Sequence, residues 1–114
     1  MTDEEAIALG KRVVACKGFR PMRGMLDMQG RTWDSSLLWR WHNEVDVPDL
    51  RDPATLGCLL ALVREAWDDP QAFVGWFDPH WKVIRCRTES LIGFLAGRGA
   101  TEAEALVAAW EAAP

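Results

Sequence analysis

Apolar positions recur with a helical period in three segments of the chain. The first segment follows Thr-Asp-Glu-Glu at 2–5, a capping-box pattern that predicts a helix beginning at its second residue and ending by Gly18. The second follows Asp52 and Pro53, which are typical of an N-cap and a first helical residue. The Asp-Asp-Pro sequence at 68–70 predicts the end of that second helix.

A third helix is predicted near the end of the chain by another capping box, Thr-Glu-Ala-Glu at 101–104. Leu106, Val107 and Trp110 then form an apolar seam along it. Trp67 occupies a similar seam position at the end of the second helix. We therefore expect both tryptophans in the core.

Two apolar runs, at 72–77 and 81–86, are separated by Asp-Pro-His and predict a β-hairpin with His80 in the turn. The predicted register pairs Trp76 with Trp81, Val74 with Val83 and Phe73 with Ile84. Because both faces of this hairpin carry apolar residues, we expect helices to cover the sheet at least partly on both sides.

Two further regions favour strands. The helical period stops between 19 and 42, where Gly and Pro are frequent, and this predicts a hairpin or meander with a return strand at 37–41. Residues 90–95 favour a strand, with a helix as the alternative, and Gly-Arg-Gly at 97–99 is expected to close that segment. The predicted order is helix, two strands, helix, two or three strands, helix. The expected fold class is α+β, an antiparallel sheet of four to five strands sandwiched by three helices.

Composition bounds the class of protein. A chain of 114 residues and 12.8 kDa fits a single domain over 1–114. Its 49% apolar and 26% charged residues indicate a globular protein rather than a disordered or membrane-spanning one. The first residues lack the features of a signal peptide, and we expect a cytoplasmic protein. Cys16, Cys58 and Cys86 lie too far apart to predict a disulfide framework or a zinc site, and burial is the expected state of the last two.

Charge adds a constraint on partners. The formal net charge of −4 argues against nucleic acid as a partner, because the field of the molecule would repel phosphate. Residues 11–40 hold seven basic and two acidic residues, whereas residues 41–78 hold eight acidic and two basic residues. This uneven distribution of charge indicates either two solvated faces or a surface with separated positive and negative charge that orients a partner.

The chain offers little for catalysis. His42 and His80 are its two histidines, and Glu44 and Asp46 could place carboxylates near the His42 imidazole, as general acid–base catalysis requires. Gly-Arg-Gly at 97–99 precedes a helix but lacks the Lys and Thr of a phosphate-binding loop. We therefore predict no catalytic residue, no metal and no cofactor, and a protein that is not an enzyme.

The second part of the chain resembles a family of small bacteriophage and prophage proteins, the phage ABA-sandwich domain. The resemblance covers residues 49–114 and rests on DPATLGCLLALVREAW at 52–67, the apolar Trp-containing hairpin, and GATEAEALVAA at 99–109. It implies a compact α/β/α sandwich made by a phage, in the cytoplasm of the host cell. It implies no catalytic residues.

These observations motivate the hypothesis of a non-enzymatic phage protein that inhibits a host system, such as CRISPR-Cas or another defence or enzyme, by binding a host protein. Trp and Arg are enriched at binding hot spots, and an acidic loop can imitate phosphate charge. The candidate contact residues are Trp33, Arg20, Arg23, Arg31, Arg40, Glu44, Asp46 and Asp49. The alternative is a phage accessory or structural module that acts by self-association, as a homodimer, or by ligand binding. A third interpretation is stacking of a nucleobase or sugar on exposed Trp.

Overall fold

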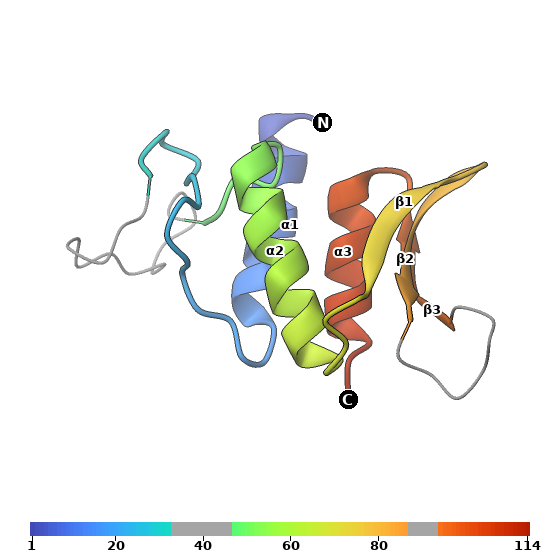
Figure 1. The fold of residues 1–114 in the computed structure, drawn as a ribbon. Helices are drawn as coiled ribbons and strands as arrows, with labels where there is room; N and C mark the ends of the chain where they lie inside the picture. Colours follow the sequence, from blue (N-terminus) through green and yellow to red (C-terminus); the bar gives the residue numbers. More distant parts are fainter. Residues whose placement is uncertain (33–46, 87–93) are drawn as a thin grey trace. The chain divides into compact units, whose positions relative to one another are not determined.

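A computed structural model describes residues 1–32, 47–86 and 94–114 of the chain. These residues form an α+β fold with three helices and a three-stranded antiparallel sheet (Figure 1). The chain divides into two compact units, residues 1–58 and 59–114, and helix α2 (Pro53–Ala66) begins in the first and ends in the second. None of the helices in the described ranges is long and apolar enough to cross a membrane. The single-domain interpretation stays a prediction.

In the first unit, helix α1 (Asp3–Ala15) begins at the predicted cap, where the Thr2 hydroxyl accepts a hydrogen bond from the Glu5 backbone at 3.1 Å. Gly10 lies at a close approach between this helix and the segment before α2. A Cβ at this position would lie 2.6 Å from Val47 Cγ2 and 2.7 Å from the Pro48 carbonyl oxygen. The glycine thus weakens the helix locally but allows the chain to pack directly against it.

The predicted hairpin between 19 and 42 is not shown by the described residues. The return strand expected at 37–41 lies outside them, and the part before it forms two isolated bridges, Leu26 with Thr32 and Asp27 with Pro48. Residues 27–31 form a turn, in which the Asp27 carboxylate accepts backbone hydrogen bonds from Gln29 at 2.9 Å and Arg31 at 2.8 Å. The expected four to five strands are therefore not shown.

Helix α2 begins as predicted. The Asp52 carboxylate accepts hydrogen bonds from the backbone N–H and the hydroxyl of Thr55, each at 2.9 Å. The Thr55 hydroxyl oxygen in turn accepts from the Leu26 backbone N–H at 2.8 Å. This buried chain of hydrogen bonds satisfies the first turn of α2 and fixes residues 25–27 beside it.

The sheet of the second unit contains β1 (Phe73–Phe77), β2 (His80–Arg85) and β3 (Phe94–Gly99), in that order. All three pairs of the predicted hairpin register are confirmed. The turn consists of Asp78 and Pro79, joined by a cis peptide bond, and His80 pairs with Phe77 as the first residue of β2. The expectation of His80 as a turn residue was wrong, because two residues suffice to connect these strands.

The segment at 97–99 was expected to close a strand. It instead forms the second half of β3. Its glycines allow helix α3 (Glu102–Glu111) to approach the sheet. A Cβ at Gly97 would overlap the backbone nitrogen of Ala109, and one at Gly99 would lie 2.5 Å from Glu104 Cβ. These glycines thus mark a close strand-to-helix contact rather than a chain break.

Helix α3 begins at its predicted cap, where the Thr101 hydroxyl accepts from the Glu104 backbone at 3.1 Å. Trp110 is buried as expected. Trp67 was also expected in the core but is half-buried. Its indole N–H donates to the Ala109 carbonyl at 2.7 Å, and the Arg85 guanidinium lies 4.4 Å from its ring centre. In Figure 1, α3 lies along one face of the sheet.

Cover on both faces of the sheet was expected, but among the described residues a helix packs on one face only. The register places Val74, Trp76, Trp81 and Val83 on the same face as Gly97 and Gly99, toward α3. The register shifts at a bulge between Val83 and Ile84, so that Leu95 lies opposite Ile84 on the other face of the sheet. Within the described part of the chain, no helix covers the other face of the sheet.

Candidate functional site

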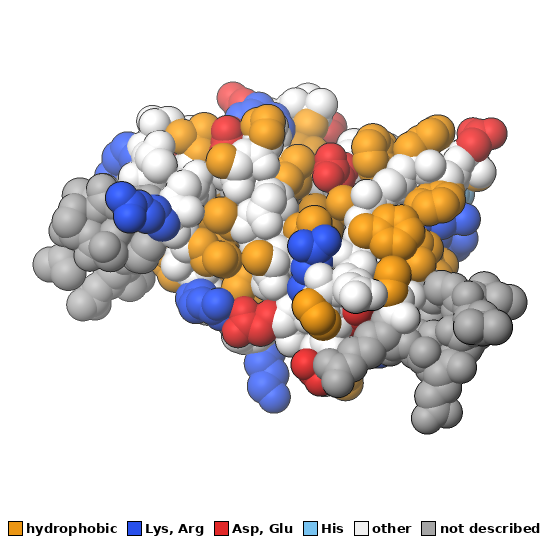
Figure 2. Space-filling view, in the orientation of Figure 1, with side chains coloured by type: hydrophobic (Ala, Val, Ile, Leu, Met, Phe, Trp, Pro, Cys, Tyr) orange, Lys and Arg blue, Asp and Glu red, His pale blue; other side chains and the backbone are white. Residues whose placement is uncertain are grey.

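The face of the sheet that points away from α3 carries exposed apolar side chains, and we call it the open face. Phe73, Phe77 and Leu95 are 39%, 41% and 44% exposed, and each is large and hydrophobic. The members of the open face are Phe73, Gly75, Phe77, His80, Lys82, Ile84, Leu95 and Arg98. Figure 2 shows hydrophobic side chains gathered over the hairpin of β1 and β2. Contiguous apolar surface of this kind is typical of a contact site.

Two phenylalanines form the edge of the open face on β1. The ring centres of Phe73 and Phe77 lie 6.3 Å apart with planes inclined by 47°. Gly75 lies between them, and a Cβ there would come within 3.3 Å of the Phe77 ring. The glycine therefore lets the Phe77 ring lie over the strand, so that the two rings form a continuous apolar ridge.

Two cations lie beside this ridge. Lys82 on β2 is directly opposite Arg98 on β3. Like charges in this position repel each other across the strands, and they contribute nothing favourable to the sheet itself. The described residues of the open face include no acidic side chain, although the whole chain carries a net charge of −4. The open face is thus apolar and locally cationic, which suits an acidic partner surface.

The hairpin also exposes an aromatic side chain on its other side. Trp76 is 54% exposed and makes an edge-to-face contact with Trp81, with ring centres 6.0 Å apart. The expected helical cover does not extend over Trp76, which lies near the turn of the hairpin. Exposed Trp is a residue type enriched at binding hot spots.

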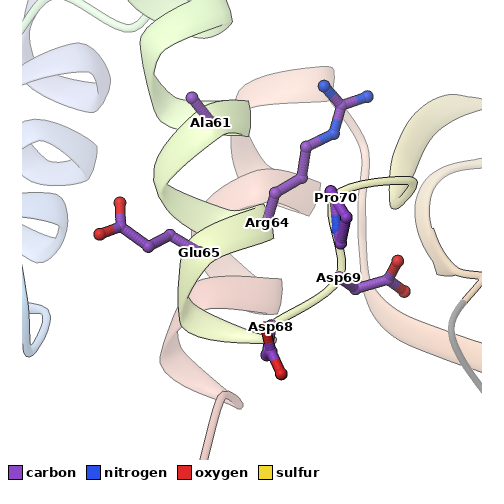
Figure 3. A pocket seen from close by; sticks show the side chains of 6 residues that line it. All are labelled: Ala61, Arg64, Glu65, Asp68, Asp69 and Pro70. Carbon is purple, nitrogen blue, oxygen red and sulfur yellow. The ribbon is translucent and has the colours of Figure 1, made fainter.

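A shallow hollow of about 520 Å³ lies at the end of α2. It is lined by Ala61, Arg64, Glu65, Asp68, Asp69 and Pro70. Figure 3 shows that the charged side chains of this hollow point in different directions rather than toward one centre. The Asp69 carboxylate is buried and accepts backbone hydrogen bonds from Gln71 at 3.2 Å and Cys86 at 2.7 Å. This carboxylate fixes two loops and is not presented to a ligand.

The structure describes four of the eight predicted contact residues. Trp33, Arg40, Glu44 and Asp46 lie outside the described residues. Arg20 and Arg23 are exposed. The Arg31 guanidinium pairs with the buried Asp27 carboxylate at 2.9 Å, so this arginine closes a turn of its own chain.

Asp49, the last of the predicted contact residues, also has a partner within the chain. Its carboxylate accepts hydrogen bonds from the backbone N–H and the guanidinium of Arg51 at 3.0 Å and 2.9 Å. Burial raises the pKa of Asp49, but the hydrogen bonds and the charge of Arg51 outweigh burial and hold this pKa below its ordinary value. The bond to Asp49 also raises the pKa of Arg51, as does a second bond to Asp3. This network supports the fold of the first unit.

The cysteines differ from one another. Cys58 is half-buried, and burial, with the charge of Asp52, raises the pKa of its thiol. Cys86 is exposed, which corrects the expectation that it is buried, because β2 ends at Arg85 just before it. Across the described part of the chain, no three His, Cys, Asp or Glu side chains gather as a metal site would require.

Comparisons of this chain with protein-family models, with curated proteins and with solved structures give no match. The site therefore rests on its own geometry. The sequence did contain a signal for it, since the hairpin is apolar on both faces and only one predicted helix follows it closely. That pattern predicted cover on both faces, whereas the described residues leave one face covered and one face open.

Proposed function

We propose that this protein is a non-enzymatic binding protein that acts by protein–protein contact through the open face. One observation carries the proposal. Phe73, Phe77 and Leu95 expose large apolar side chains beside the Lys82 and Arg98 pair, which has no neutralising acid among the described residues of that face. Apolar rings supply contact area, and the cations select and orient a partner surface that is apolar and acidic.

The wider setting of this proposal is a phage-encoded protein that inhibits a host system. It draws on the resemblance to phage proteins and on the small acidic chain without an evident catalytic constellation. In that setting the contact blocks a host protein, for example a component of CRISPR-Cas or of another defence, rather than modifying it. The alternative, a phage accessory or structural module that self-associates, is favoured by the uncharged edge strand β1.

Affinity capture from a bacterial lysate tests the proposal. The tagged chain is compared with a face variant, Phe77→Ala with Lys82→Glu, and with a matched control, Arg20→Glu with Arg23→Glu. Circular dichroism first establishes that each variant is folded. We expect the face variant to lose a captured protein by tenfold or more, while the control keeps it.

Two results would overturn this function. The first is that no protein is retained at moderate salt, or that the arginine control loses the protein and the face variant keeps it. The second is a change of Trp fluorescence on titration with single-stranded oligonucleotides, because Trp76 is exposed on the same hairpin. That change would indicate stacking of bases rather than contact with a protein.

A further inference from the structure

Strand β1 lies at the edge of the sheet and carries no charge. Its residues are Phe-Val-Gly-Trp-Phe, and within the described ranges its only strand partner is β2. Edge strands are commonly protected from other chains by charges, prolines or bulges. None of these occurs between Phe73 and Phe77. The outer edge of β1 is therefore open to pairing with another strand.

The sequence of β1 is close to symmetric about Gly75. We propose that two copies of this chain associate by antiparallel pairing of their β1 strands, with a two-fold axis at Gly75. In this register Phe73 of one copy lies opposite Phe77 of the other, and Val74 lies opposite Trp76. Aromatic pairs and pairs of an aromatic with a β-branched residue are the favourable cross-strand combinations. Gly75 meets its own copy at the axis, where a small residue allows close approach.

The charges at the two ends of β1 are complementary in the same register. Asp78 of one copy arrives opposite Ala72 of the other. The Ala72 carbonyl accepts a hydrogen bond from Arg64 Nε at 2.7 Å, so a guanidinium is already held at that end of the strand. Within the described part of the chain, neither Asp78 nor Arg64 has an ion pair. Pairing of the two copies therefore forms two equivalent ion pairs between Asp78 and Arg64, and no like charges meet along the strands.

The result is one continuous sheet of six strands. The two open faces join, and Phe73 and Phe77 of both copies form a single row of four rings. This inference does not depend on the proposed function, because it concerns the edge of β1 rather than its face.

Sedimentation velocity over a range of concentrations tests the dimer with the purified full-length chain. We expect a monomer–dimer equilibrium in the wild type. Asp78→Arg and Arg64→Glu should each weaken dimerisation by about tenfold, since each replaces two attractive contacts with repulsive ones. The double variant should recover most of the loss, because the exchanged charges attract again. Trp76→Lys, which places a charge on the edge strand, should abolish the dimer.

The control is Lys82→Glu, a charge reversal of the same kind on β2. It lies on the open face and not at the edge, so dimerisation should stay within about twofold of the wild type, an energy difference below 0.5 kcal/mol. A wild-type monomer at every concentration would overturn the inference. So would a double charge variant that is no better than its parents although circular dichroism shows it folded. Loss of partner capture in the Lys82→Glu variant with an intact dimer would bear only on the proposed function.

Discussion

The contact of α3 with the sheet leads to a direct test, the substitution Gly97→Ala. An added Cβ at Gly97 would lie 2.7 Å from both the Ala105 carbonyl oxygen and Ala109 Cα, and closer still to the Ala109 nitrogen. Ordinary contact begins at 3.4 Å, so α3 would have to move away from β3 by at least about 0.7 Å, and by more to clear the Ala109 nitrogen. All three obstructing atoms belong to the backbone, and no change of rotamer can relieve the overlap.

Overpacking of this kind costs about 1–3 kcal/mol, and we expect the upper end because a whole helix must shift. A loss of about 3 kcal/mol is a large fraction of the 5–15 kcal/mol that stabilises a typical domain, and it lowers the midpoint of thermal unfolding by roughly 10 °C or more. Local preference acts in the opposite direction, since Ala suits a strand at least as well as Gly does. The destabilisation therefore reports the approach of α3 alone.

Urea unfolding followed by Trp fluorescence provides the measurement, because Trp110 is buried in α3. The matched control is Gly57→Ala in α2, where a Cβ would meet no atom within 4 Å. That change should stabilise the chain by about 0.5–1 kcal/mol through helix propensity. If Gly97→Ala proved as stable as the wild type, the close contact between β3 and α3 would be refuted.

Two further predictions concern titration and reactivity. The lowered pKa of Asp49 means that its bond to Arg51 stabilises the fold above the ordinary value of 3.8 and is lost as the pH falls through the lowered pKa. Between pH 5 and about pH 3 the wild type should therefore lose more unfolding free energy than Asp49→Asn, and equal losses would contradict the assigned ion pair. Exposed Cys86 should react with a thiol reagent well before Cys58, whose pKa is raised by burial. Cys86→Ser should remove the fast phase, and a fast phase that persists in this variant would show the assignment to be wrong.

Local signals predicted local structure well. The starts of all three helices follow from capping residues such as Thr2, Asp52 and Thr101, whose partners lie within three positions. The register of the hairpin was equally accessible, because a short turn leaves one pairing that matches Trp76 with Trp81. In each case the information lies within a few residues of the feature.

Features that depend on distant residues were missed or misread. The glycines at 97 and 99 looked like the end of a segment, since nothing in the sequence indicates that α3 packs directly on them. Asp27 looked like part of a hairpin, but its carboxylate organises a turn instead. The open face was predicted as covered, because alternation shows which residues share a face and not whether a helix reaches it.

The position of α3 after the strands has a consequence for biosynthesis. The ribosome makes β1 more than thirty residues before the end of the helix that covers its inner face. Without that helix, Val74 and Val83 are accessible to chaperones and to neighbouring chains, like the rings of the open face. Truncation before Trp110 should therefore lower the soluble yield more than an equivalent change near the beginning of the chain.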